Sequence, residues 1–271
     1  MRIFSILTAV LFLTFAVRAT ETPWIDHGGM LQTRLVSASA DMTSEAGVLL
    51  AWEAKLAPGW KTYWRSPGEA GLPVRVFVGG DEVAPMYPYP ERFELFGIHT
   101  FGYSHQVLIP FRMKAAATRP VKIRVDFMVC KDICVPFEQA YEFVPELMGP
   151  SASEHDIRFG AWLAKVPLQE KTVNGLEVIG AKVAGKVGHQ KLIVDVKADG
   201  DLSKADLLAE VNDMFNFSMP KIRLLEDGRR ARIILSAMTS GKSYELRGET
   251  VRLTLSDGRG GAIDRTLLLP K

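Results

Sequence analysis

Glycine and proline divide most of this 271-residue sequence into short runs in which apolar and polar side chains alternate. In the run from Leu72 to Val78, for example, Val74, Val76 and Val78 share one face. Alternation with a period of two is typical of half-buried β-strands. The pattern predicts strands over residues 48–56, 60–64, 72–78, 106–113, 121–129, 191–196, 221–225, 230–235, 251–255 and 262–269. An all-β protein built from sandwiches is therefore expected.

One helix is predicted in the middle of the chain. It runs from about Ser153, its N-cap, to Ala164, with Ile157, Ala161 and Trp162 near one face. Helical spacing of these apolar residues indicates that this face packs against another element.

The length of the chain indicates two domains of ordinary size. We expect the helix and its flanks, residues 149–170, to link a first β domain at residues 20–148 to a second at residues 171–271. Glu226-Asp227-Gly228 and the glycine-rich segment 256–261 each predict a hairpin turn within the second domain.

The first 19 residues have the features of a secretory signal peptide. Arg2 precedes an apolar run from Ile3 to Val17, and Val17-Arg18-Ala19 provides a small-x-small cleavage pattern. The run is short for a membrane span, although an uncleaved N-terminal anchor is the alternative. We expect a mature protein that does not span the membrane and, in a Gram-negative cell, lies in the periplasm.

The charge of the mature chain is balanced. Cleavage after Ala19 removes Arg2 and Arg18, which leaves 31 basic and 31 acidic residues. A balanced chain has no general attraction to nucleic acid or to anionic lipid. We therefore expect neither as a partner.

The chain contains only two cysteines, Cys130 and Cys134, four residues apart. A disulfide across so short a ring stabilises a protein by roughly 2 kcal/mol, against nearly 5 for a ring of about a hundred residues. The pair therefore suits a reversible dithiol better than a structural disulfide, although exported proteins contain both. A Cu(I) or Zn(II) site is the third interpretation, with His99, His105 and Met128 as candidate helpers.

The strand before the pair fixes the side on which Cys130 lies. Val125, Phe127 and Val129 fall on the apolar face, so Cys130 falls on the other, wetter face. This alternation predicts an accessible Cys130 sulfur. A disulfide also requires the chain to turn within residues 131–133, because residues four apart in an extended strand lie about 13 Å from each other.

The segment Phe127 to Pro136, read as FMVCKDICVP, resembles the cysteine motif in the N-terminal periplasmic region of the thiol:disulfide interchange protein DsbD family, especially its ScsB-like branch. The segments Trp60 to Gly68 and Tyr87 to Arg92 resemble further landmarks of that region. The likeness is densest between Gly59 and Pro136 and extends more weakly over the second domain.

This resemblance implies two immunoglobulin-like sandwiches and a function. It implies a protein-disulfide reductase type of thiol–disulfide oxidoreductase that needs no cofactor or metal and works through a reversible Cys130–Cys134 disulfide. Cys134 would bond to the partner and Cys130 would resolve the mixed disulfide. The partners would be exported thiol or disulfide proteins and a separate membrane protein that donates electrons.

The family also has a cap loop over its cysteines. By alignment, Leu95 takes the place of the family's shielding aromatic, with Phe96 beside it. Tyr63 and Trp64 are candidates to line the cysteine pocket, although aromatics in such strands are more often core residues. The alternative function is an exported β-sandwich without enzymatic activity that binds a partner protein or copper, with Cys130–Cys134 as a permanent disulfide.

Overall fold

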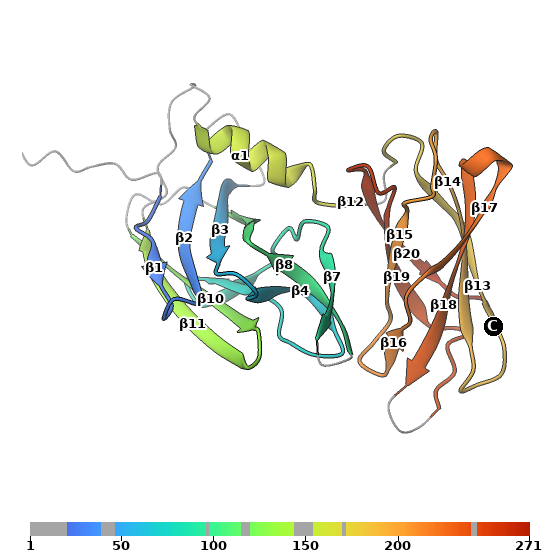
Figure 1. Cartoon of the computed structure of the whole chain (residues 1–271). Coiled ribbons are helices and arrows are strands. Elements are labelled where there is room, and N and C mark those ends of the chain that lie inside the picture. Colours follow the sequence, from blue (N-terminus) through green and yellow to red (C-terminus); the bar gives the residue numbers. More distant parts are fainter. Residues whose placement is uncertain are drawn as a thin grey trace, which may run out of the picture.

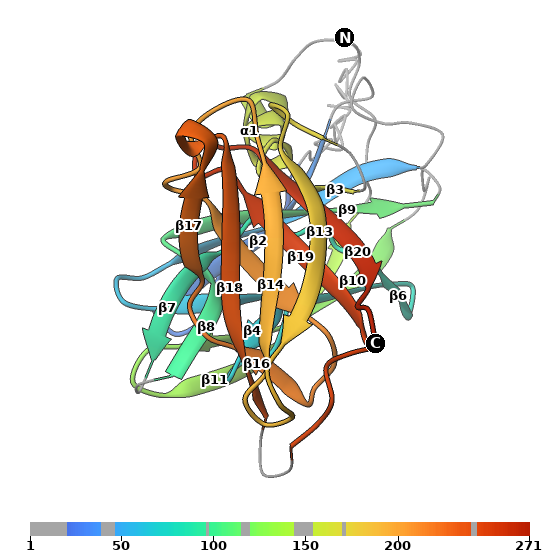
Figure 2. The ribbon, with the colours of Figure 1, turned by 90° about the vertical axis from the view of Figure 1, so that its right-hand side faces the viewer.

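The structure is a computed structural model and describes residues 21–38, 47–95, 98–114, 120–143, 154–169, 172–239 and 243–271. The predicted signal peptide, residues 1–19, lies outside these ranges. The described chain is mostly β and forms two bodies that lie side by side, each made of two sheets (Figures 1 and 2). None of its helices is long and apolar enough to cross a membrane.

The first body places a four-stranded sheet opposite a seven-stranded one. The order in the smaller sheet is β1 (Ile25–Asp26), β2 (Leu31–Ser37), β3 (Val48–Leu56) and β9 (Gln106–Met113). The order in the larger sheet is β6 (Asp81–Val83), β5 (Arg75–Val78), β10 (Val121–Cys130), β4 (Lys61–Gly68), β8 (Ile98–Ser104) and β7 (Glu91–Leu95), with β11 (Cys134–Phe143) on the other side of β10.

The second body has the same two-sheet plan. One sheet runs β12 (Leu168–Gln169), β20 (Ala262–Leu268), β19 (Thr250–Ser256) and β15 (Asp206–Glu210). The other runs β13 (Glu177–Ala184), β14 (Lys191–Lys197), β18 (Arg230–Thr239) and β16 (Phe215–Phe217), with β17 (Lys221–Leu225) also paired to β18. Both predicted hairpins are confirmed, since β17 pairs with β18 and β19 pairs with β20.

Alternating side chains fill the space between the sheets of each body. In the first body, the buried residues include Trp52 and Ile109 from one sheet and Val125 and Phe127 from the other. A second cluster, which contains Val194 and Leu253, fills the other body. The two-residue period that predicted the strands is therefore the period with which they bury their apolar face.

The helix α1 (Glu154–Leu163) packs on the outer face of the smaller sheet of the first body (Figure 1). Phe159 is fully buried there against Val36 and Leu108, and Trp162 packs beside it. The predicted helical face was wrong in part, because Ile157 is 72% exposed. The residues between the domains in sequence therefore cover the first body rather than forming a free connection.

One histidine is an unexpected part of the core. His27 is 8% exposed, and its ring meets those of Phe127 and Phe137 at centroid distances of 5.4 and 4.9 Å. Its Nε2 atom lies 2.8 Å from the hydroxyl of Thr33, which hydrogen-bonds Tyr141 at 2.6 Å. Burial lowers the pKa of His27, against the opposing charge of Asp26.

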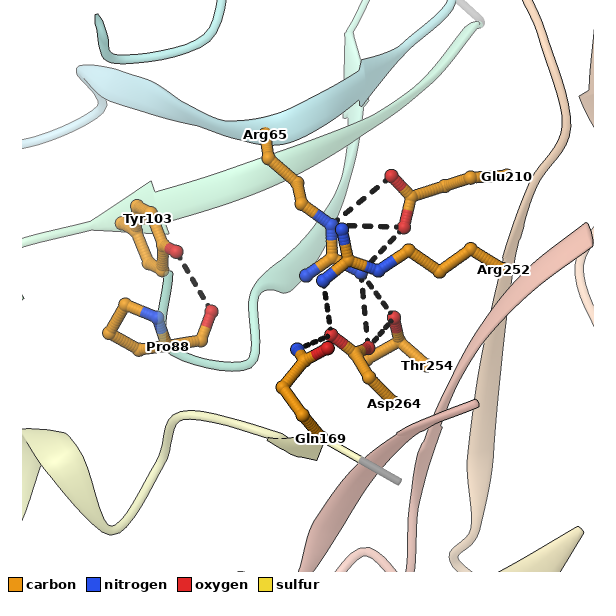
Figure 3. A network of polar contacts seen from close by, with 8 residues as sticks. All are labelled: Arg65, Pro88, Tyr103, Gln169, Glu210, Arg252, Thr254 and Asp264. Atoms are coloured by element: carbon orange, nitrogen blue, oxygen red, sulfur yellow. Dashed lines mark hydrogen bonds and ion pairs between the residues drawn. The ribbon is translucent and has the colours of Figure 1, made fainter. Parts of the chain in front are cut away.

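The two bodies are joined by a dense polar network (Figure 3). Arg65, on β4 of the first body, donates to Glu210 at 2.6 Å, to Thr254 at 2.6 Å and to Asp264 at 3.1 Å. All three acceptors belong to the second body. The guanidinium is therefore surrounded by oxygen atoms of the opposite body, the geometry in which buried ion pairs persist.

Asp264 is the most buried acid of this network, with an exposure of 2%. It also accepts hydrogen bonds from Gln169 at 2.7 Å, Arg252 at 2.5 Å and Thr254 at 2.6 Å. Burial opposes its charged form, but the charge of Arg65 and the bonds from Thr254 and Arg252 outweigh burial. The pKa of Asp264 therefore lies below its usual value.

A second contact joins the bodies at the edge strand β7. Arg92 makes a bidentate pair with Asp206, with both distances 2.7 Å, and donates to the carbonyl of Leu207 at 2.8 Å. The hydroxyl of Tyr89 donates to the same carboxylate at 2.9 Å. Leu208, the next residue of β15, belongs to the apolar cluster of the first body. Side chains of the second body thus bind Arg65 of β4 and Arg92 of β7, the two strands on either side of β8.

Candidate functional site

The two cysteines close the end of the hairpin formed by β10 and β11. Cys130 is the last residue of β10, Cys134 is the first residue of β11, and the two are direct partners in the ladder. Residues 131–133 form the turn between them, as predicted, and the sulfurs are joined in a disulfide. The required turn is therefore supplied by a tight strand-to-strand reversal.

The two sulfurs differ in their surroundings. Cys134 is exposed, whereas Cys130 has an exposure of 0%. The expectation of an accessible Cys130 was therefore wrong. Strand alternation does place Cys130 outside the apolar core, but β4 lies beside it and covers that end of the sheet, with Lys61 in register with Cys130. A neighbour 69 positions earlier in the sequence thus determines the burial of Cys130.

Tyr63 is the residue that covers Cys130. Tyr63 and Cys130 form a buried cluster of their own, separate from the main core, and Met128 packs against it. The ring of Tyr63 is held closely by Gly71, where a Cβ atom would lie only 2.4 Å from the ring. Gly71 has a φ of +106°, a conformation that favours glycine. The ring therefore has little freedom to move away from Cys130.

Trp64 lies elsewhere. Neighbouring residues of a strand point to opposite faces, so Trp64 belongs to the core cluster between the sheets and has an exposure of 0%. Of the two aromatic residues that the sequence grouped at the cysteines, only Tyr63 is packed against Cys130 in the buried clusters of the structure.

The hydroxyl of Tyr63 has an unusual environment. The side chain is 1% exposed, and the oxygen has no hydrogen-bond partner among the residues that the structure describes. Burial raises the pKa of Tyr63, so the phenol keeps its proton at neutral pH. The only polar atom of this side chain is thus an unused donor in the small cluster that contains Cys130.

The predicted cap residues are Leu95 and Phe96. Phe96 falls outside the described residues, and Leu95 is described only as the last residue of β7, opposite Ile98. The cap therefore stays a prediction. Within the described part, Phe93 of β7 is half-buried, with the Nζ atom of Lys61 4.6 Å from its ring centroid. Lys61 is thus the ladder partner of Cys130 and also lies against the ring of Phe93 on β7.

No group of three histidine, cysteine, aspartate or glutamate side chains that could hold a metal occurs among the described residues. Met128, one candidate helper for a metal, packs against Tyr63 and Cys130. The geometry at the cysteines is therefore that of a disulfide with one covered and one open sulfur.

Comparison with known proteins relates the two bodies to two families. Residues 32–145 match the family model described as "Thiol:disulfide interchange protein DsbD, N-terminal". Residues 165–266 match a domain of unknown function, DUF8393. A search of curated proteins gave no significant match.

Among solved structures, the chain is similar to the N-terminal periplasmic domain of ScsB from Proteus mirabilis. The TM-score is 0.75 and the sequence identity is 20%. The similarity covers 93% of this chain and 99% of that chain, so the two share the arrangement of both bodies.

Proposed function

Because residues 32–145 belong to the family of DsbD N-terminal domains, we propose that this protein is an exported thiol–disulfide interchange protein. It passes reducing equivalents through Cys130 and Cys134, as a thiol–disulfide oxidoreductase of the protein-disulfide reductase type. The observation that carries the proposal is a disulfide at a hairpin end with one exposed and one buried sulfur, within a domain of this family.

The exposed Cys134 is the point of attack. A thiolate must approach a disulfide sulfur directly, and Cys130 is covered by Tyr63 and β4. The partner thiolate attacks the Cys134 sulfur, a mixed disulfide forms, and Cys130 leaves as a thiolate. A second partner thiol then displaces Cys134, so that the partner is oxidised and both cysteines are reduced. Transfer to the next protein runs the same steps in reverse, with Cys130 resolving the mixed disulfide.

The proposed setting follows from the leader sequence and the family. The mature protein works in the periplasm, where a separate membrane protein reduces it and exported disulfide proteins oxidise it. Both bodies are immunoglobulin-like sandwiches in this proposal. Leu95, the last residue of β7, and Phe96 shield the cysteines until a partner docks.

The reduction potential of the Cys130–Cys134 couple tests the proposal. The mature protein is equilibrated in glutathione or dithiothreitol buffers and the free thiols are counted by alkylation. An exchanging couple should lie at about −180 to −270 mV, the range of known exchange proteins. A value far below about −300 mV is typical of a structural disulfide and would refute the proposal.

Single-cysteine variants test the assigned roles. Cys130→Ser leaves the exposed Cys134, and Cys134→Ser leaves the buried Cys130 as the matched control. With glutathione disulfide as the probe, the mixed disulfide should form at least about tenfold faster in Cys130→Ser, because access controls the rate of exchange. Equal rates, or faster reaction of Cys134→Ser, would contradict the assignment.

A further inference from the structure

The hydroxyl of Tyr63 is buried and has no hydrogen-bond partner within the described part of the chain, a situation that folding usually avoids. Leaving a buried donor unsatisfied costs free energy, and nearly all such groups in native proteins find a partner. A phenylalanine would fill the same space without that cost. The oxidised structure therefore gives this oxygen no stabilising role, and a role in another state of the site has to be considered.

The position of Tyr63 indicates which state this is. Tyr63 packs against the fully buried Cys130, in a cluster that the main core does not share. Gly71 lies against the Tyr63 ring, and Gly102, the ladder partner of Tyr63, has no side chain to compete for the space. The hydroxyl is consequently carried by a side chain that is held in contact with one of the two reacting residues.

When the disulfide opens, the Cys130 sulfur needs a hydrogen-bond donor. When a partner thiolate bonds to Cys134, the electron pair of the broken bond goes to the Cys130 sulfur, which becomes a thiolate. A charge on a fully buried group is strongly unfavourable unless a donor faces it. Because burial keeps Tyr63 protonated, its hydroxyl has a proton to offer at that moment.

We propose that Tyr63 is a catalytic residue whose hydroxyl donates a hydrogen bond to the Cys130 sulfur when the disulfide opens. This inference rests on the proposed function and deepens it. The bond lowers the pKa of the Cys130 thiol and makes Cys130 a better leaving group, because thiols of lower pKa leave faster. In the reverse direction, the same bond holds Cys130 as the thiolate that resolves the mixed disulfide.

Other charged groups near Cys130 act on the same thiol. Lys61 faces it from β4, and Lys131 and Asp132 lie in the exposed turn. Along β10, Arg124 is paired with Asp126 at 3.5 Å and with Glu138 of β11 at 2.9 Å. Replacement of Tyr63 by phenylalanine changes none of these groups, so their contribution is the same in both proteins compared below.

The test measures the pKa of the Cys130 thiol in Cys134→Ser and in the double variant Tyr63→Phe/Cys134→Ser. Because the chain has only two cysteines, a carbon-13 label on cysteine Cβ gives a single NMR signal that reports Cys130. Hydrogen bonds to charged groups correspond to a change of roughly 10- to 100-fold in the thiolate equilibrium. The pKa should therefore rise by about one to two units in the double variant. An unchanged or lower pKa would overturn the proposal.

A kinetic measurement on the complete cysteine pair supplies the second arm. Tyr63→Phe should slow the reduction of the disulfide by dithiothreitol at least about threefold, because the leaving thiol becomes more basic. The matched control is Tyr103→Phe, which removes a hydroxyl that is also buried but donates to the Pro88 carbonyl at 2.8 Å (Figure 3). Tyr103→Phe should lower the Tm and leave both the thiol pKa and the rate unchanged. Equal rate effects in the two variants would refute a specific role for Tyr63.

The two proposals fail in different ways. The thiol pKa in Cys134→Ser does not depend on whether any partner exchanges with the pair. A shifted pKa with a reduction potential far below about −300 mV would keep the role of Tyr63 and reject the proposed function. A suitable potential with no pKa shift would do the opposite.

Discussion

Tyr63 and Arg65 lie two residues apart on β4, and their polar groups differ in hydrogen bonding. The side chain of Tyr63 packs against Cys130, and its hydroxyl has no hydrogen-bond partner in the described residues. The guanidinium of Arg65 reaches into the second body and meets three oxygen-bearing side chains. The hydrogen-bonded guanidinium of Arg65 holds the two bodies together. The unpaired hydroxyl belongs to Tyr63, which packs against Cys130 of the disulfide that is proposed to open. Within this pair of residues, the hydrogen-bonded group is the one at the interface and the unpaired group is the one beside Cys130, although Trp64 between them also has an N–H that is unpaired across the described ranges.

The largest loss of stability is expected when an acceptor is removed from the polar network around Arg65. Asp264→Ala leaves Arg65 and Arg252 without the carboxylate that they share. Breaking a buried ion pair from one side is strongly destabilising, so the free energy of unfolding should fall by about 3 kcal/mol, below the upper range because Arg252 is partly exposed. Urea denaturation measures the change. A loss no larger than that of an exposed carboxylate would show that the cluster is not structural.

The two buried tyrosines of the larger sheet sharpen the comparison at single-atom scale. Tyr103→Phe should lower the free energy of unfolding by about 1–2 kcal/mol, because the Pro88 carbonyl loses its donor. Tyr63→Phe should cost nothing or stabilise the oxidised protein, because an unpaired hydroxyl is removed. Thermal and urea denaturation of the oxidised proteins give both values, and a larger loss for Tyr63→Phe would reverse the interpretation.

As the pH falls, the protein should lose stability first through His27 and, at lower pH, through Asp264. The pKa of His27 is lowered in the folded state, so the unfolded chain binds the proton first and stability declines as the pH falls below 6.5. The pKa of Asp264 is also lowered, so its contribution is present above 3.8 and is lost as the pH falls through the lower folded value.

Urea denaturation at a series of pH values separates these two groups. His27→Gln should flatten the pH dependence just below 6.5 and leave the loss below 3.8 in place. A slope just below 6.5 that His27→Gln does not change would assign the effect to other groups.

The smallest effect is expected at the surface. Arg75 and Glu82 make a bidentate pair at 2.8 and 2.6 Å, but both side chains are about half exposed. Exposed pairs gain little over water and are screened by salt. Glu82→Ala should therefore give a change near the error of urea denaturation, and added salt should remove it. A loss comparable with that of Asp264→Ala would mean that burial does not separate the two kinds of pair.

The strands of the fold were predictable where local pattern alone decides. Strands 48–56 and 106–113 match the structure residue for residue, because both are continuous runs rich in apolar residues that are buried along nearly their whole length. The run predicted from Leu72 forms a strand only from Arg75, two residues after Pro73, which has no N–H to donate. The strand β11 was not predicted, and it accommodates Pro136 as a strand that pairs with β10 off the main path of the sheet.

The sequence identified the two cysteines of the candidate site but not the residues that surround them. The spacing of Cys130 and Cys134 indicated a turn that a disulfide could close, but the burial of Cys130 depends on β4, which only long-range pairing brings alongside. The partners of Arg65 lie 145 to 199 positions away in the sequence. No local period encodes such contacts, so neither the covered sulfur nor the interface between the bodies follows from the pattern of side chains.

The placement of the cysteines at the last of ten ladder pairs bears on how redox state is signalled. Nine other pairs hold β10 and β11 together when the disulfide opens, and the ring that it releases contains only a three-residue turn. The oxidised and reduced proteins therefore present nearly the same outline to other molecules. Under the proposed function, a donor and an acceptor protein would bind the same surface in turn, and they would distinguish the two redox states by the sulfur atoms themselves rather than by a change of shape.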